Sequence, residues 1–252
     1  MKTEILGDGE PEHAVIYHIH GDEPCGRKAV EKLRDSEYRI KKPLKLVFAN
    51  EEAAEREVRY IDTDLNRTFP GDKESELHEE RLAPRIINEL EGLKALNLHS
   101  TRSQPTPFGG LKDTDEETLE MAKATGARKF ALFEDSNGSL DAHINSILVE
   151  AGPQGTEKAA EQAYQTLLNF LGFYDVIEYE PELGEPEIYK VFETVEGAGY
   201  EFFGANFQKV EEGEKYAERN GEDVIAEHEF YPVLMSTSGY SDMLGFKAER
   251  IQ

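Results

Sequence analysis

The stretch AVIYHIHGDEPCGRKAVEKL, residues 14–33, decides the fold class of this chain. It begins with the run AVIYHI, residues 14–19, whose β-branched and apolar character is typical of a buried strand. The loop HGDE follows, and Pro24 then opens a segment with helical apolar spacing that we expect to run to Leu33. A strand, a loop and a helix in this order predict one unit of an α/β fold.

The same signals return further along the chain. We expect strands at residues 44–50, 94–100, 127–133 and 144–150. We expect helices at residues 158–171 and at residues 74–90, where Pro84 should kink or interrupt the helix. Strands that alternate with helices predict an α/β protein, with a mixed sheet flanked by helices on both faces.

The sequence pattern changes beyond Asp175, where short extended runs are broken by Gly and Pro. We therefore expect a larger α/β domain at residues 1–174 and a small β-rich domain at residues 175–252. A chain of 252 residues is long enough to enclose a site in a well-buried core.

The charge balance limits the classes of partner. The chain carries 52 acidic against 28 basic residues, a formal net charge of -24. Nucleic acid and anionic membrane surfaces are bound through clustered Lys and Arg, so neither is expected as a partner. A salt-rich cytoplasm screens the self-repulsion of such an acidic surface, which favours a halophilic source.

The chain has one cysteine, Cys25, which excludes an intramolecular disulfide. The sequence MKTEILGDGEPEH at the start has no apolar core of a secretion signal, and no apolar run approaches the roughly 20 residues that cross a bilayer. These features predict a cytoplasmic protein.

Polar motifs follow three of the expected strands: HGDE, NLHS and VEAG. In an open α/β sheet the ends of the strands are where ligands bind. His20 and Glu23 lie three residues apart in the first motif, a pair that is weak evidence alone. His99, in the second motif, completes the His, Glu, His set of a catalytic zinc site that keeps one position for water. We therefore predict one zinc ion per chain.

Five motifs together carry a more specific resemblance. They are HGDEPCG at 20–26, RYIDTDLNRTFPG at 59–71, LNLHSTRS at 96–103, ILVEAGPQG at 147–155 and YPVLMSTSGY at 231–240. In order and spacing they resemble the aspartoacylase and succinylglutamate desuccinylase family, relatives of the zinc carboxypeptidases. The resemblance implies a zinc carboxypeptidase-like fold and hydrolysis of the amide bond of a small N-acyl amino acid.

The resemblance also implies roles for the residues at the metal. His20, Glu23 and His99 would be the zinc ligands, and Glu150 the general base that activates the water there and protonates the leaving amine. Arg59 would polarise the scissile carbonyl and stabilise the oxyanion.

Further residues would contact the substrate. By the same resemblance, Asn66 and Arg67 would hold its carboxylate, and Tyr240 would come from a C-terminal domain that closes the substrate pocket over the catalytic domain. Each residue also has a purely structural interpretation, such as an ordered turn at Asn66 and Arg67 or a packed tyrosine at Tyr240.

The sequence departs from the family at two places. The segment SLDAHINSILVE before Glu150 lacks the family's further substrate-binding arginine and offers only His143. Arg102 either supplies the missing cation or is a surface charge. Asn97 stands where the family often has an aspartate, two residues before the metal histidine.

Other interpretations stay open at this point. His18 shares a strand face with His20, although a packing role is typical of a histidine inside a strand. A carboxypeptidase acting on peptides is the nearest enzymatic alternative, and a non-catalytic binding protein that retained the fold is the alternative from another class. The sequence also leaves open whether the chain forms a homo-oligomer.

Overall fold

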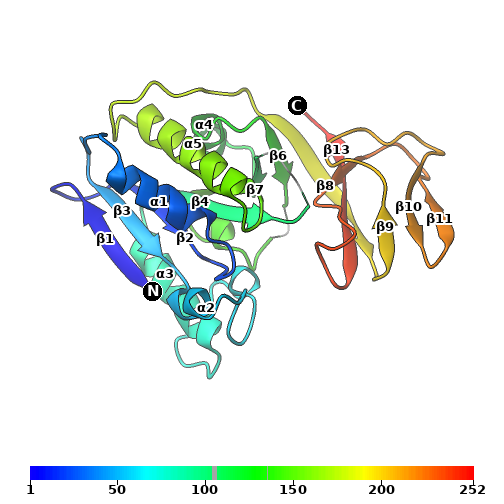
Figure 1. Cartoon of the computed structure of the whole chain (residues 1–252), viewed down its shortest axis with the longest axis horizontal. Coiled ribbons are helices and arrows are strands. Elements are labelled where there is room, and N and C mark those ends of the chain that lie inside the picture. Colours follow the sequence, from blue (N-terminus) through cyan, green and yellow to red (C-terminus); the bar gives the residue numbers. More distant parts are fainter. Residues whose placement is uncertain (104–106, 135) are drawn as a thin grey trace.

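The computed structural model describes residues 1–103, 107–134 and 136–252 (Figure 1). In these residues a ten-stranded sheet has the order β1-β3-β2-β4-β7-β5-β6-β8-β13-β12, and a three-stranded sheet has the order β11-β10-β9. The strands are β1 (Lys2–Leu6), β2 (His13–Tyr17), β3 (Leu44–Phe48), β4 (Lys94–Thr101), β5 (Phe108–Leu111), β6 (Lys129–Leu132), β7 (Ser146–Pro153), β8 (Glu187–Glu196), β9 (Tyr200–Phe202), β10 (Lys215–Arg219), β11 (Glu222–Ile225), β12 (Tyr231–Val233) and β13 (Met243–Arg250). The helices are α1 (Cys25–Asp35), α2 (Glu51–Glu55), α3 (His78–Leu90), α4 (Glu116–Ala124) and α5 (Glu157–Phe173), with 3-10 turns η1 (Leu65–Arg67) and η2 (Leu140–Ala142).

The large sheet is mixed, as predicted. Strands β3, β2, β4 and β7 are neighbours and parallel, whereas β1 pairs with β3, and β5 with β7, in antiparallel fashion. The carboxyl ends of β2, β4 and β7 therefore meet at one edge of the sheet. The three polar motifs of the sequence follow or end these strands.

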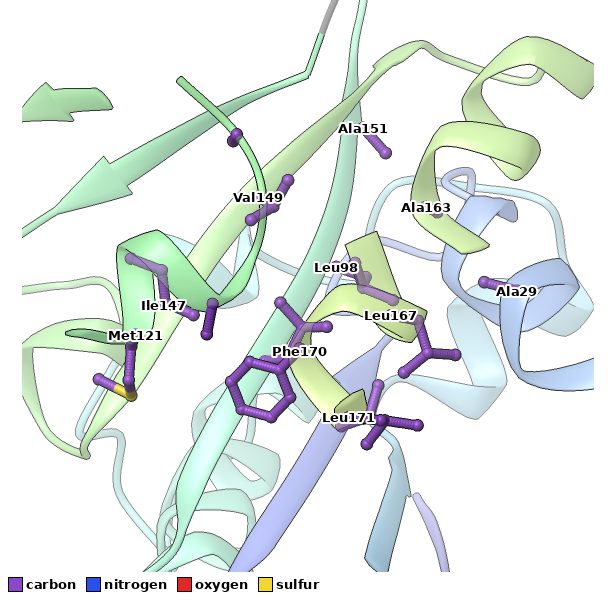
Figure 2. Packing of buried hydrophobic residues seen from close by; sticks show 14 of the residues in the cluster. Ala29, Leu98, Met121, Ile147, Val149, Ala151, Ala163, Leu167, Phe170 and Leu171 are labelled. Carbon is purple, nitrogen blue, oxygen red and sulfur yellow. The ribbon is translucent and has the colours of Figure 1, made fainter. Parts of the chain in front are cut away.

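The two faces of the sheet are covered by different helices. Leu98 of β4 and Val149 of β7 point into a core with α1, α4 and α5, where Leu167 and Phe170 of α5 are fully buried (Figure 2). Alternate residues such as Ala95 point to the opposite face, which packs against α3. Because side chains alternate along a strand, His99 and Glu150 lie on the α3 face, away from the α1 and α5 layer.

The helix α3 differs from the expectation at Pro84. It begins at His78 rather than at residue 74, and it continues without interruption through Pro84 to Leu90. Pro84 has no N–H to give to the carbonyl of Glu80, four residues earlier. That carbonyl instead accepts a hydrogen bond from the backbone N–H of Asp72, 2.9 Å away, so the position costs no unpaired acceptor.

The part beyond residue 175 is β-rich but does not stand apart from the main sheet. Strand β8 pairs in parallel with β6, and β13 and β12 continue the ten-stranded sheet. Strands β9, β10 and β11 form the separate antiparallel sheet at the end of the molecule opposite β1 (Figure 1). The division into two domains at residues 174 and 175 stays a prediction.

Four helices or strands before residue 175 were not expected from the sequence: β1, β5, α2 and α4. Within the described residues, the structure contains no helix whose length and apolar character would suit a membrane crossing.

Candidate metal centre and active site

The structure brings together His20, Glu23 and His99, a set of three residues that we call the metal group. His20 and Glu23 lie in the loop between β2 and α1, and His99 lies near the end of the adjacent parallel strand β4. All three are at least 97% buried, and their ligand atoms lie within 4.8 Å of one another. The loop passes so close to α2 that a Cβ atom at Gly21 would meet the carbonyl carbon of Ala53 at 2.2 Å, so the tight turn requires glycine.

The charges in this group fit a divalent metal. The Nδ1 atoms of His20 and His99 lie 2.8 and 3.0 Å from the two oxygens of Glu23. Burial alone would lower the pKa of His20, but Glu23 and a hydrogen bond with Asp64 raise it to about 9. Burial would raise the pKa of Glu23, yet the two histidines hold it well below its usual range. Two imidazoles and one carboxylate are the donor set of many catalytic zinc sites, so these residues suit that ion.

Asp64 orients the ring of His20, and it was not among the candidate residues found from the sequence. Its Oδ1 lies 3.0 Å from Nε2 of His20, which fixes the ring with Nδ1 turned toward Glu23. Its Oδ2 accepts a hydrogen bond from Nε of Arg59 at 3.0 Å. Burial would raise the pKa of Asp64, but His20 and Arg59 hold it far below its ordinary value. The signal for Asp64 was its place in the motif between Arg59 and Asn66.

Arg59 lies between the metal group and the solvent. Its Nη1 is 3.3 Å from Oε1 of Glu23, and its side chain is 40% exposed. The bonds to Asp64 and Glu23 hold the guanidinium in one orientation, close to His20. A fixed, permanently charged group in this position can stabilise negative charge that develops on a substrate.

Glu150 lies next to the metal group on β7, where it pairs in register with His99 of β4. Its Oε2 is buried and has no hydrogen-bond partner among the described residues. Burial, followed by repulsion from Glu23, raises the pKa of Glu150 to about 7. A carboxyl group with this pKa can both accept and release a proton near neutral pH.

Asn66 and Arg67 belong to η1, whose amino end is capped by Asp64 through the backbone N–H of Asn66 at 2.9 Å. The Oδ1 atom of Asn66 accepts the backbone N–H of Leu140 at 3.2 Å. Nη1 of Arg67 donates to the carbonyl of Asn66 at 2.9 Å. These bonds tie the loop to η2 and leave both side chains on the wall of the cavity.

The loop that carries these residues is anchored by Glu79 of α3, a second residue that the sequence analysis missed. The carboxylate is completely buried. It accepts the backbone N–H groups of Ile61, Asp62 and Thr63 at 2.7, 2.9 and 3.2 Å, and the side-chain amide of Asn50 at 2.9 Å. One side chain thus fixes the backbone between Arg59 and Asp64.

A cavity of about 570 Å³ opens beside the metal group. It is lined by His20, Arg59, Asn66, Arg67, His99, Phe108, Gly110, Leu111, Lys112, Phe133, Glu134, Ser136, Gly138, Ser139, Asp141, Leu148, Glu150, Val191, Phe192, Glu193, Thr194, Leu234, Tyr240 and Phe246. Tyr240 thus shares this cavity with the other expected substrate-binding residues, and burial followed by the nearby Glu150 carboxylate raises its pKa.

Arg102 is not brought into the cavity. It is not among the described lining residues, its side chain is exposed, and its Nε donates to Oε1 of Gln154 at 3.2 Å. Strand β4 ends at Thr101, the residue before Arg102. The placement favours the interpretation of Arg102 as a surface charge.

The remaining polar residues near the site have structural contacts. The ring of His18 packs on that of Phe48, with centroids 4.9 Å apart. The thiol of Cys25 donates to the carbonyl of His99 at 3.2 Å. Asn97 donates to Oδ1 of Asp141 at 3.5 Å, so a carboxylate from η2 lies beside the position where the family often has an aspartate.

One family model and several solved structures match this chain. A model described as the succinylglutamate desuccinylase/aspartoacylase catalytic domain matches residues 12–174. A succinylglutamate desuccinylase/aspartoacylase structure from Rhodobacter sphaeroides has a TM-score of 0.78 at 18% identity, covering 99% of this chain and 89% of that one. The product-bound ectoine utilization protein EutE (DoeB) from Ruegeria pomeroyi has a TM-score of 0.78 at 18% identity, with 99% and 88% covered. Murine aminoacylase 3 has a TM-score of 0.77 at 22% identity, with 97% of each chain covered.

At these identities the structural matches establish the shared fold. No curated protein matches the chain. The family model, however, matches residues 12–174 of the 252, which is well over half of the sequence. On this match, the chain belongs to the succinylglutamate desuccinylase/aspartoacylase family.

Proposed function

We propose that this chain is a zinc-dependent amidohydrolase that removes the acyl group from N-acyl amino acids. The observation that carries the proposal is the position of Glu150 beside His99, in register on the adjacent strand, at the end of the cavity that His20 also lines. A carboxylate beside a set of two histidines and one glutamate is what metal-assisted hydrolysis of an amide requires. Membership in the family supports the same class of reaction.

Zinc, held by His20, Glu23 and His99, would supply a Lewis acid that lowers the pKa of water and polarises the amide carbonyl. The chain's own residues move the proton. Glu150 takes a proton from the attacking water and later delivers it to the leaving nitrogen, so that amide and water become a carboxylate and an amine. Its pKa of about 7 suits both transfers. Arg59 donates to the carbonyl oxygen as that atom becomes negative.

We assign substrate binding to Asn66, Arg67 and Tyr240, which line the same cavity as Glu150. Arg67 and Asn66 hold the carboxylate of the amino acid, the planar guanidinium of Arg67 matching its two oxygens. Tyr240 lies on the cavity wall near Glu150, where it would help to close the cavity around the substrate. Residues 175–252 contribute this tyrosine and the wall around Val191, and we assign to them the role of closing the substrate pocket.

We assign one zinc ion to each chain, bound by His20, Glu23 and His99. We also assign the protein to a salt-rich cytoplasm. The support for that environment is compositional: a net charge of -24 is tolerated best where salt screens the repulsion among surface carboxylates.

The test is amine release from N-acetyl amino acids, N-succinyl amino acids and dipeptides by zinc-loaded protein. The proposal expects hydrolysis of an N-acyl amino acid that a chelator abolishes and that Glu150→Gln lacks. Faster release of C-terminal residues from peptides would instead indicate a carboxypeptidase. Binding of N-acyl amino acids without turnover would indicate a binding protein.

A further inference from the structure

The cavity beside the metal group is longer than the reaction alone requires. Its lining crosses the sheet from His99 on β4 through Leu148 on β7 and Gly110 on β5 to Val191 on β8. Four strand intervals at ~4.8 Å place β8 about 19 Å from β4. An acetyl group and one amino acid, extended at ~3.5 Å per residue, span about 7 Å. The part of the cavity along β6, β8 and β13 is therefore available to another portion of the substrate.

The far wall of the cavity is apolar and aromatic. The rings of Phe133 and Phe246 meet edge to face, with centroids 5.2 Å apart, and Val191 lies in the same apolar cluster. Residues 191–194 all line the cavity. In a regular strand, successive side chains point to opposite faces of the sheet, so four consecutive side chains would not all face one cavity. The pairing of β8 with β13 shifts here, with Val191 opposite Ala248 and Glu193 opposite Lys247, so Phe192 is the extra residue of a bulge.

The charges in the cavity are unevenly distributed. Arg59 and Arg67 lie by the metal group, and Lys112 is the one further Lys or Arg of the described lining. Glu134 and Glu193 are each paired with a lysine outside the lining, Lys190 at 2.8 Å and Lys247 at 2.7 Å.

Asp141 adds a buried acidic side chain to the lining at the β4 and β7 end of the cavity, where it contacts Asn97 and Ser146. It is 93% buried, and its Oδ1 accepts the hydroxyl of Ser146 at 2.6 Å. It belongs to the segment SLDAHINSILVE, which contains no arginine. A second carboxylate on the substrate would meet this buried acidic side chain at the β4 and β7 end, which disfavours its binding there. Beyond Arg59 and Arg67, Lys112 is the one cation of the described lining that could attract it.

We infer that the preferred substrates carry a single carboxylate and a bulky apolar group that lies against Phe133, Val191 and Phe246. This inference rests on the proposed function and narrows it, because it excludes N-acetylaspartate and N-succinylglutamate as good substrates. The apolar group is either the side chain of the amino acid or a long acyl chain, and both would gain from leaving water at this wall.

The experiment compares kcat/KM of the zinc-loaded full chain for five substrates. N-acetylphenylalanine against N-acetylglycine tests an apolar side chain, and N-octanoylglycine against N-acetylglycine tests an apolar acyl chain. N-acetylaspartate, with two carboxylates, and N-succinylglutamate, with three, test the effect of carboxylates beyond the first. At least one apolar substrate should exceed N-acetylglycine by about 10- to 200-fold, the range that hydrophobic pockets supply. Both of these substrates, the dianion and the trianion, should fall below N-acetylglycine.

Variants locate the effect on the wall. Phe246→Ala and, as a substitution that keeps the shape of the side chain, Val191→Thr should both lower the ratio of kcat/KM for the best apolar substrate to that for N-acetylglycine. Phe203→Ala is the matched control, because Phe203 is 49% exposed and is not among the described lining residues. It should leave the ratio unchanged.

The outcomes separate the inference from the proposed function. If N-acetylglycine is hydrolysed but N-acetylaspartate or N-succinylglutamate is the better substrate, the inference is wrong and the proposed function stands. An unchanged ratio in both wall variants also overturns it. If no N-acyl amino acid is hydrolysed by zinc-loaded protein, the proposed function itself fails.

Discussion

Replacing Glu79 by glutamine should damage both the stability and the activity of this protein. The two oxygens of Glu79 accept four hydrogen bonds, two each, from Asn50, Ile61, Asp62 and Thr63. Glutamine has one oxygen and one NH2 group, so in either orientation two of the four donors face another donor. At about 1–3 kcal/mol for each unsatisfied group, the variant should lose about 2–6 kcal/mol of unfolding free energy.

Activity should fall as well, because the segment that Glu79 fixes lies between Arg59 and Asp64. A displacement of about 1 Å in catalytic groups can cost on the order of 100-fold in rate. Urea unfolding followed by circular dichroism measures the first effect, and kcat/KM for an N-acyl amino acid measures the second. Glu80→Gln, the neighbour on α3 whose side chain makes no hydrogen bond within the described residues, is the control.

Two results would refute this reasoning. If Glu79→Gln unfolds at the same urea concentration as the parent, the four hydrogen bonds do not contribute as their geometry indicates. If it is destabilised but keeps full kcat/KM under conditions where it is folded, Glu79 supports the fold without positioning the loop of Arg59.

Three further predictions concern the same site. Glu150→Gln should keep its zinc but lose at least ~100-fold in turnover, because the amide cannot accept the proton of water; steady-state kinetics with metal analysis checks this. Asp64→Asn should weaken zinc binding by about 10- to 100-fold in a chelator competition, since the carboxylate orients His20, and unchanged affinity would contradict that role. Burial would raise the pKa of Glu79, but its hydrogen bonds hold it below 4.5; the stability gap between wild type and Glu79→Gln should therefore be constant above about pH 5 and close as the pH falls through the folded pKa. A gap that persists at low pH in urea titrations would argue against this.

The strands that carry the site could be predicted because their residues are apolar and bounded by turns. AVIYHI, LKLVFAN and KALNLHS read as buried strands, and the observed β2, β3 and β4 begin and end within two residues of those stretches. Strand β5, with the sequence FGGL, gives no such signal because glycine disfavours strands. Its glycines have a tertiary cause: a Cβ at Gly109 would lie 2.1 Å from the ring of Phe130.

From the sequence, only those site residues could be predicted that a motif and its spacing identify. His20, Glu23 and His99 follow from chemistry and spacing, and the structure brings them together. Asp64, Glu79 and Asp141 act through contacts with residues distant in sequence, which spacing does not encode. Arg102 had the right charge and lies near His99 in sequence, but its side chain is exposed, bonds to Gln154 and is not among the described lining residues.

The central claim is that zinc bound by His20, Glu23 and His99 enables hydrolysis of an N-acyl amino acid. The most direct measurement is amine release from N-acetyl amino acids while zinc is titrated into metal-free protein. The account predicts that the rate rises linearly, saturates at one equivalent of zinc per chain, and stays at background in His99→Ala. Hydrolysis by the metal-free protein, or equal activity in His99→Ala at one equivalent, would contradict it.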